Sequence, residues 1–428
     1  MKTFPWQKAS LFILFSLILW FYFAGIPSVP FHPDESTQIY MSSDASESAD
    51  MLAYVPGGRS GDKWRYRLID SPLSRTLMGW ALKIKGVTPN LSDWNWSANW
   101  RVNIALGALP SDDALVTARW SVAWVFPLTC LFLYLFAKKI SGSASAFVAV
   151  LLFATNALVL MHTRRAMSES VLLCAVTALV WLMIDIKNKP WFTAIAAALA
   201  VNAKQTAFPL AALAGIEMLI LPQKEKLFTK ALKSLIFVAV VLGISWFLNP
   251  AYWQHPIDAI GEGLRQRQEL TEKMRVDYNT SSNPLEQAII MTAQVFIQQP
   301  MAYDVLNYFE ATRSAVDAYM SQPVNTLFRG YTGGAIMLVL SILGWIILWK
   351  HTGKSAPEKR LPFLIMNGIL LVFIVMLMFM TAAPFQRYYV ILIPFLCIFQ
   401  STAIVFLWNT FKNAIKKRTA GTGSPQEG

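Results

Sequence analysis

The chain has 428 residues, of which 55% are hydrophobic and only 14% are charged. This composition excludes an ordinary soluble domain and indicates a membrane protein that crosses the bilayer several times. A net charge of +12 is compatible with a nucleic-acid partner. However, Lys and Arg gather in the short segments expected inside the cell, so the excess reports membrane topology and predicts no nucleic-acid binding.

The apolar runs predict an all-α integral membrane protein, a polytopic helical bundle with about ten transmembrane spans and both termini in the cytoplasm. Basic clusters follow alternate spans, as the positive-inside rule requires. We expect residues 1–411 to form the transmembrane domain and residues 412–428 to form a disordered basic cytoplasmic tail. The expected spans are Leu11–Val29, Ala114–Ala137, Ala144–Met161, Val171–Ile186, Trp191–Ala203, Thr206–Leu221, Leu235–Leu248, Gly333–Trp349, Leu361–Thr381 and Tyr389–Phe411.

The stretch Trp191–Leu221 allows two topologies. As one long span it would place Lys204 in the middle of the membrane and reverse the side of everything that follows. The distribution of Lys and Arg in the second half of the chain favours two short spans that meet near Lys204. Each is shorter than the ~20 residues that cross a full bilayer, so this corner should dip below the outer surface.

Two long segments, residues 32–113 and 249–332, are expected outside the membrane. Neither has the alternation of an independent β domain. An amphipathic helix is predicted from Leu73 to Ile84 in the first, and helices over Pro256–Val276 and Pro284–Gln298 in the second. We expect these helices to lie on the membrane above the bundle.

A carboxylate pair, Asp34-Glu35, follows the first apolar segment and should emerge on the outer face. Two carboxylates just above a bilayer can accept a proton from an acceptor hydroxyl, or hold a cation, beside a lipid-borne substrate. The competing interpretation is that both acids are solvated and that Asp34 caps the next helix. Taken alone, the motif favours that second interpretation.

Other ionisable residues lie close to the membrane, where charges are costly and tend to be functional. Arg119, Lys204 and Arg387 should all face the same leaflet as Asp34, an arrangement suited to a lipid phosphate. Each cation by itself is equally explained by a snorkelling or ion-paired side chain. An outer turn carries His162, Arg164, Arg165 and Glu169, and its adjacent arginines are expected to be solvated.

Glycosyl transfer from a polyprenyl-phosphate sugar needs this set of residues. The lipid phosphate is the leaving group, and cations stabilise its growing charge. A carboxylate removes the proton of the acceptor on the opposite face of the anomeric carbon, which inverts the configuration. The sequence thus predicts an enzyme of cell-envelope glycosylation, active at the outer face of the cell membrane.

The motifs resemble those of the GT-C glycosyltransferases, in particular the protein O-mannosyltransferase superfamily (glycosyltransferase family 39) with its aminoarabinose transferases. The resemblance rests on Asp34-Glu35 followed by Tyr40, on Asp70-Ser71-Pro72-Leu73, on Arg119, on Arg165 to Glu169, on Lys204 and on Arg387-Tyr388. It implies a mannosyltransferase-like activity with a catalytic role for Asp34. We place Glu35 in the same catalytic pair and expect it to hold the loop rather than to take the proton. It also implies donor-phosphate contacts for Arg119, Lys204 and Arg387. Acceptor-side or structural roles follow for Asp70, Glu169, His162, Arg165 and Tyr40.

The chain departs from the family pattern at Ser71, where many relatives carry Lys or His, so Arg67 or Arg75 is expected to supply that charge. A secondary transporter remains an alternative, although it would predict inverted repeats and charges near the midplane. A GT-C-like protein that has lost its activity is another. No metal ligands are predicted, but a divalent metal stays an open alternative. Partners are expected to be membrane lipids, a lipid-linked sugar donor and a glycan, lipid or protein acceptor, with the sugar and acceptor undetermined.

Overall fold

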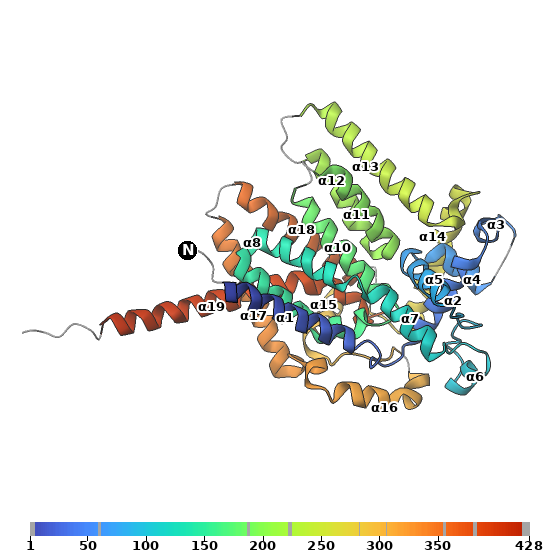
Figure 1. Ribbon diagram of the computed structural model, residues 1–428. Helices are drawn as coiled ribbons and strands as arrows, with labels where there is room; N and C mark the ends of the chain where they lie inside the picture. Colours follow the sequence, from blue (N-terminus) through green and yellow to red (C-terminus); the bar gives the residue numbers. More distant parts are fainter. Residues whose placement is uncertain are drawn as a thin grey trace, which may run out of the picture.

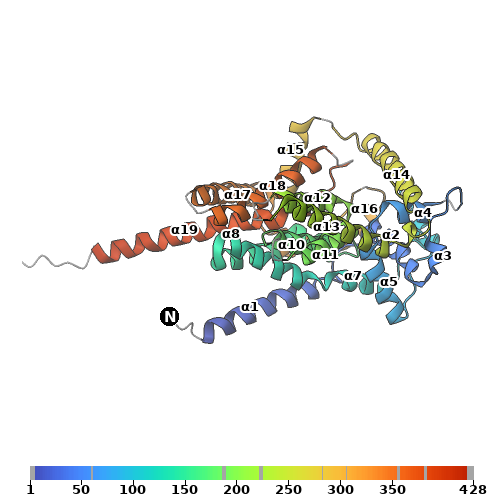
Figure 2. The ribbon, with the colours of Figure 1, turned by 90° about the horizontal axis from the view of Figure 1, so that it is seen from above.

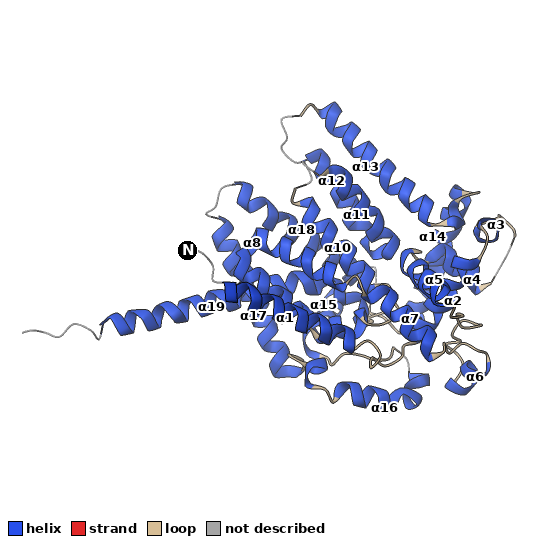
Figure 3. Ribbon diagram, in the orientation of Figure 1, coloured by secondary structure: helices blue, strands red, loops and turns tan. Residues whose placement is uncertain are grey.

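The computed structural model describes residues 5–58, 61–185, 189–220, 225–281, 283–304, 306–353, 357–379 and 383–421. Within these ranges every regular element is a helix, and no strand occurs (Figure 3). Five helices are long and apolar enough to cross a membrane, and further apolar helices are shorter. The all-α membrane class is therefore confirmed, whereas the number of ten spans stays a prediction.

The apolar helices pack side by side, and most helices of the two long polar segments gather at one end of this bundle (Figures 1 and 2). The expected ends of three spans, at Ile186, Leu221 and Thr381, lie outside the described residues. The apolar helices are α1 (Pro5–Ala24), α7 (Asp112–Ala123), α8 (Phe126–Ala154), α9 (Ala157–Thr163), α10 (Glu169–Met183), α11 (Pro190–Ala203), α12 (Phe208–Ile220), α13 (Leu227–Leu248), α17 (Gly330–Gly353), α18 (Pro357–Phe379) and α19 (Ile393–Gly421).

Small residues let these helices approach closely. In α11, Ala194, Ala197 and Ala200 recur every third residue and are at most 1% exposed. On α17, a Cβ added to Gly344 would lie 1.8 Å from the Phe399 carbonyl oxygen of α19, so only glycine allows this contact. Close backbone approach at small residues is the usual basis of helix packing in a bilayer, where apolar burial between helices gives little driving force.

The chain turns at Lys204. Helix α11 ends at Ala203, Lys204 is extended with φ −161° and ψ 137°, and α12 begins at Phe208 after one 3₁₀ turn. Asn202 Nδ2 donates to Ser245 Oγ (2.9 Å) near the end of α13, while Gly215 of α12 contacts Phe237 in the middle of α13. Helix α12 therefore runs back along α13, and the single-span alternative for Trp191–Leu221 is excluded.

Most helices of the two polar segments lie at the end of the bundle where α7 begins and α13 ends, whereas the helix Pro284–Thr292 packs beside α18 (Figures 1 and 2). The predicted helix at Leu73–Ile84 forms as α5, but it packs through Met78, Gly79 and Leu82, while Trp80 and Ile84 are 56% and 82% exposed. Of its apolar side chains, Leu73 and Leu77 are thus partly buried against the core, and Trp80 and Ile84 point outward. The first segment contains α2 (Pro33–Ser42), α3 (Ala49–Leu52), α4 (Asp62–Ile69), α5 (Leu73–Lys85) and α6 (Trp100–Ala105), and the second contains α14 (Pro256–Asp277), α15 (Pro284–Thr292) and α16 (Phe309–Met320).

The C-terminal segment differs from its prediction. Helix α19 continues as a regular helix to Gly421, so residues 412–421 are not a disordered tail. The polar stretch continues the helix because most of its residues are good helix formers, with Asn413, Thr419 and the terminal Gly421 as the weaker ones. Residues 422–428 lie outside the described residues.

Candidate functional site

Asp34 lies in the first turn of α2, directly after Pro33 at the N-terminus of the helix. The cap of this helix is His32: its Nδ1 accepts a hydrogen bond from the Asp34 backbone N–H (3.1 Å). The Glu35 carboxylate accepts reciprocally from the His32 backbone N–H (3.0 Å), which completes a capping box. The Asp34 carboxylate is therefore not the cap, and its side chain is 28% exposed.

Glu35 is a buried structural anchor. Arg119 Nε and Nη2 donate to its two carboxylate oxygens at 2.7 and 2.8 Å, and the Ala166 backbone N–H donates at 2.8 Å. Burial by itself would raise the pKa of Glu35, but the charge and hydrogen bonds of Arg119 outweigh it and hold that pKa below its usual value. Because Arg119 Nη1 also donates to the Ile26 carbonyl (3.2 Å), this arginine ties α7 to the start of the first outer segment.

This geometry does not fit the expectation that Arg119 binds the donor phosphate. Its side chain is 2% exposed, and its guanidinium is engaged by Glu35 and Ile26. The physical reason is that the Glu35 carboxylate, which is 0% exposed, needs a buried counter-charge. We therefore assign Arg119 to the support of the Asp34 loop.

Arg387 stands at the centre of the site. Its Nη2 lies 3.0 Å from the Asp34 carboxylate, and its Nη1 contacts the Asp304 carboxylate. Asp304 comes from the second polar segment and is 8% exposed. No sequence motif points to this residue, because it belongs to none of the recognised patterns and lies 270 positions after Asp34.

Lys204 and Arg387 share the ring of Tyr388. The Lys204 ammonium and the Arg387 guanidinium both lie over the Tyr388 ring, at 5.1 and 5.3 Å from its centroid. Lys204 Nζ also donates to Glu169 Oε1 at 2.5 Å. Glu169 Oε2 is buried without a hydrogen-bond partner among the described residues. The structure thus brings together Lys204, Arg387, Glu169 and Asp34, but not Arg119.

His32 connects these groups as a neutral side chain. Burial, opposed by the Asp34 charge and assisted by the charges of Arg165 and Arg387, lowers its pKa to about 3. Since Nδ1 accepts the Asp34 N–H, the network assigns the ring proton to Nε2, which donates to Asp304 at 3.0 Å.

His32, Asp34 and Asp304 present ligand atoms within 4.8 Å of one another, the arrangement from which a metal site can be built. The donors do not fit a cation as they stand. Arg387 already joins the two carboxylates, and the assigned tautomer leaves His32 without a free lone pair. A divalent ion would have to displace Arg387.

The turn after α9 is buried, contrary to the expectation of solvated arginines. Arg164 and Arg165 are each 1% exposed. Arg164 donates to the carbonyls of Tyr22 and Phe21, both at 2.9 Å, and Arg165 donates to the carbonyls of Pro30 and Ala302. They satisfy backbone oxygens where α1 ends and where the second polar segment crosses. His162 is 3% exposed, and neither ring nitrogen has a hydrogen-bond partner within the described ranges.

The remaining expected residues frame the site. Burial raises the pKa of Asp70, and the next residue, Ser71, donates to the Val201 carbonyl (2.8 Å) near the Lys204 corner. Of the two arginines expected to supply charge here, Arg67 bonds Asp44 at 2.7 and 3.0 Å, whereas Arg75 bonds the Tyr66 carbonyl and acts electrostatically on Asp70. Tyr40 lies in the last turn of α2 and lines a large cavity described below.

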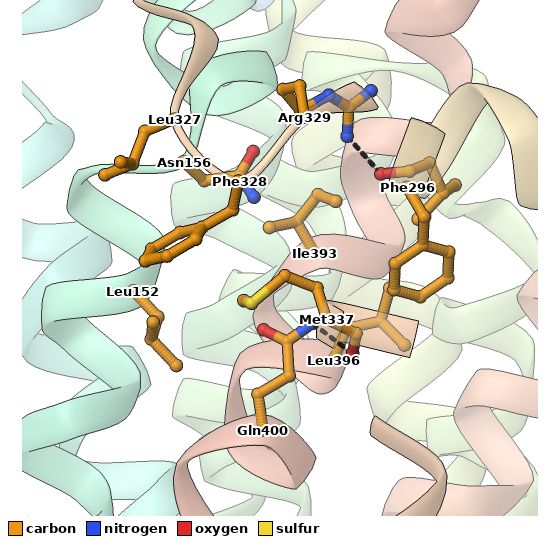
Figure 4. Close-up of a pocket in the computed structure, with 11 residues that line it drawn as sticks. Leu152, Asn156, Phe296, Leu327, Phe328, Arg329, Met337, Ile393, Leu396 and Gln400 are labelled. Atoms are coloured by element: carbon orange, nitrogen blue, oxygen red, sulfur yellow. Dashed lines mark hydrogen bonds between the residues drawn. The ribbon is translucent and has the colours of Figure 1, made fainter. Parts of the chain in front are cut away.

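A small cavity of about 20 Å³ lies between α8, α17 and α19 (Figure 4). None of the expected site residues lines it. Its polar lining includes Asn156, Arg329 and Gln400, and Gln400 Nε2 donates to Ser341 Oγ at 3.0 Å. The volume holds about one water molecule, so we regard it as a structural cavity.

Comparisons with solved structures find partial likenesses. The AglB oligosaccharyltransferase of Archaeoglobus fulgidus, solved with an inhibitory peptide and a dolichol-phosphate, matches at 11% identity and a TM-score of 0.46, over 92% of this chain and 48% of that one. The apo form of the oligosaccharyltransferase of Archaeoglobus fulgidus matches at 12% identity and a TM-score of 0.47, over 90% and 48%. Both TM-scores lie below 0.5, and the chain spans about half the length of these proteins.

A comparison with curated protein sequences finds none that matches. The family model of dolichyl-phosphate-mannose-protein mannosyltransferases matches residues 103–253. This region contains Arg119, Arg165, Glu169 and Lys204, on which the expected resemblance partly rests. The similarity of the chain to the protein mannosyltransferase family, which the motifs indicated, is therefore confirmed over residues 103–253.

Proposed function

We propose that the protein transfers a sugar from a polyprenyl-phosphate-linked donor to an acceptor at the outer face of the cell membrane. The observation that carries this proposal is that Arg387 contacts the Asp34 carboxylate and shares the Tyr388 ring with Lys204. A partly exposed carboxylate and two cations thus lie in one cluster, as general-base attack with an anionic leaving group requires.

In this reaction Asp34 takes the proton of the acceptor hydroxyl. The hydroxyl oxygen bonds to the anomeric carbon while the bond from that carbon to the phosphate oxygen breaks. The phosphate leaves with the electron pair and is stabilised by Lys204 and Arg387. Base and leaving group then lie on opposite faces of the sugar, so the product has inverted configuration. Glu35 and Arg119 fix the helix that carries Asp34 but do not touch substrate.

The site has to lose a contact before it can act. In the free protein Arg387 pairs with Asp34 and Asp304, and Lys204 pairs with Glu169. A phosphate competes for both cations, and a sugar placed between Asp34 and the phosphate separates Asp34 from Arg387. Donor binding therefore releases the carboxylate that serves as the base. The proposal places the site outside, with about ten spans and cytoplasmic termini, as the charge distribution favours.

Mass analysis of envelope glycans, glycolipids and glycoproteins from a deletion strain tests this function whatever the sugar and the acceptor are. The expected result is loss of one sugar residue from one class of product and accumulation of a lipid-linked sugar. Wild-type protein should restore the product, and Asp34→Asn should not, although it reaches the membrane in equal amount. Identical products in the deletion and parent strains would refute the proposal.

A further inference from the structure

A cavity of about 640 Å³ lies among the helices of the polar segments, beside the proposed site. Its wall comes from the end of α2, the start of α4, the stretch Ser92–Trp96 and Lys273 of α14. This volume falls within the range of about 300–1,000 Å³ that is typical of small-ligand sites. None of the residues that we assign to proton or phosphate handling lines it.

The lining is aromatic and polar. Four rings share the wall with charged side chains of both signs, while Leu106 is the single aliphatic side chain among the lining residues. The rings are those of Tyr40, Tyr66, Trp94 and Trp96, and the charged residues are Asp62, Lys63, Arg65, Asp93 and Lys273. An acyl chain needs apolar walls, so this lining disfavours a lipid tail. Sugar rings offer C–H faces that pack on aromatic rings and hydroxyls that bond to carboxylates and amides. The chemistry therefore matches a saccharide.

A buried donor in this wall lacks a partner. Trp94 is 2% exposed, and its indole N–H has no hydrogen-bond acceptor within the described part of the chain. Buried indole N–H groups normally bond to an acceptor, and leaving one unpaired is unfavourable. This nitrogen is closed to solvent, so a ligand hydroxyl in the cavity reaches it only if the Trp94 ring turns toward the cavity.

The cavity adjoins the proposed base. Thr37 stands three residues after Asp34, on the same face of α2, and its Oγ1 donates to the Asp93 carboxylate of the cavity wall at 2.6 Å. On the other side, the Trp96 ring meets the His32 ring with centroids 6.4 Å apart. Two separate contacts therefore connect the cavity wall to the turn that carries Asp34.

We propose that this cavity binds a saccharide acceptor and presents one of its hydroxyls to Asp34. The inference rests on the proposed function for the direction of transfer, but saccharide binding itself needs no catalysis. The acceptor is then a glycan rather than a polypeptide or a lipid. Tyr40 is then an acceptor-binding residue, because it lines the cavity from the same helix that carries Asp34.

Saturation-transfer NMR on the full chain in phospholipid nanodiscs tests the proposal, since nanodiscs avoid the sugar head groups of common detergents. The probes are mannotriose, cellotriose, chitotriose and a twelve-residue peptide rich in Ser and Thr. We expect at least one trisaccharide to bind and the peptide not to bind. Tyr40→Ala and Trp96→Ala should weaken that binding about tenfold or more, whereas Trp80→Ala, which removes an exposed indole on α5 outside the cavity, should leave it unchanged.

The Asp34→Asn variant distinguishes saccharide binding in the cavity from the transfer reaction. It should keep saccharide binding while it abolishes transfer. If Asp34→Asn keeps full transfer activity but trisaccharide binding still depends on Tyr40, the acceptor site stands and the proposed base fails. Binding of the peptide alone, binding of no trisaccharide, or equal binding by wild type, Tyr40→Ala and Trp96→Ala would overturn the acceptor site.

Discussion

Arg387 Nη2 lies 3.0 Å from the Asp34 carboxylate, although the two residues come from opposite ends of the chain. The proposed base is therefore held by a cation until another anion competes for it. In the proposed mechanism, Asp34 therefore becomes available as a base only when a donor phosphate engages Arg387.

Asp34→Asn should reduce sugar transfer by about 10²–10⁴-fold, because the amide keeps the size of the side chain but cannot accept the proton. Thermal unfolding should stay close to wild type, since the cap of α2 is His32 and not Asp34. The measurement is the initial rate of product formation per folded protein. A variant that retains full activity would show that Asp34 is not the base.

Glu35→Gln, unlike Asp34→Asn, should mainly lower the stability of the folded protein. It leaves the buried Arg119 guanidinium without a counter-charge, which costs about 3–5 kcal/mol of unfolding free energy. Replacing both partners, as Glu35→Gln with Arg119→Met, should recover part of that loss because no buried charge remains. Denaturation of the purified variants measures both effects, and a single variant as stable as wild type would contradict the structural role.

Lys204→Met and Arg387→Gln should each weaken the binding of polyprenyl phosphate by about 10- to 100-fold, the loss expected for one charge-assisted contact of about 1.5–3 kcal/mol. Lys204→Met leaves the Glu169 carboxylate without its counter-charge. The double variant Lys204→Met with Glu169→Gln removes that unpaired charge and should therefore fold normally while still binding polyprenyl phosphate weakly. Lys85→Met removes an exposed cation of the first polar segment and should bind normally. Unchanged affinity in both single variants would remove the phosphate site.

His32 predicts a pH dependence of stability. Its pKa is about 3 in the folded protein against 6.5 for an unperturbed histidine, so between these values the unfolded chain binds a proton that the folded chain excludes. Stability should thus fall with decreasing pH below 6.5, by up to about 1.4 kcal/mol per pH unit.

Unfolding at pH 7.5 and pH 5 measures this slope. His32→Asn keeps an N-cap acceptor without titrating and should flatten it. His255→Asn, at a residue that is 46% exposed, should leave the slope as in wild type. An equally steep slope in His32→Asn would show that another group controls it.

The proposed topology can be tested by cysteine labelling, because Cys130 and Cys397 are buried and Cys174 is only partly exposed. Leu91→Cys and Val276→Cys, at residues 86% and 80% exposed in the two polar segments, should react with a membrane-impermeant maleimide in intact cells. Phe228→Cys, 79% exposed beside the basic cluster before α13, should react only after permeabilisation. Labelling on the reverse sides would invert the proposed topology.

The helices are predicted well from the sequence because their apolar length is a local property. The charge distribution predicts the corner at Lys204, and the helix ends there in extended backbone; that two short spans meet at this corner stays a prediction. Ion pairs form between residues that are far apart in the sequence. The sequence places Arg119, Lys204 and Arg387 at the same leaflet, but it does not show which of these cations is already paired with a buried carboxylate. The structure shows that Arg119 is the paired cation, because it is the counter-charge of the buried Glu35 carboxylate.

Asp304 and the cavity wall lie beyond sequence reasoning for the same reason. Asp304 reaches the site because Arg165 bonds Ala302 and His32 bonds Asp304, contacts that no spacing in the sequence reveals. By residue type alone, Trp94 and Trp96 suit a membrane interface. The structure buries the Trp94 ring between Phe31, Trp100 and Tyr308 instead.

Helix α19 has 29 residues and is therefore about 44 Å long, whereas the hydrocarbon core of a bilayer is only about 30 Å thick. If its first turn starts beside Arg387 at the outer surface, its last turns extend past the inner head groups. The cluster Lys412, Lys416, Lys417 and Arg418 then forms a rigid cationic post at the anionic cytoplasmic leaflet. This cationic helix end would then set how deep α19 lies in the bilayer. It would thereby also set the position of Arg387 along the membrane normal, relative to the lipid that carries the sugar.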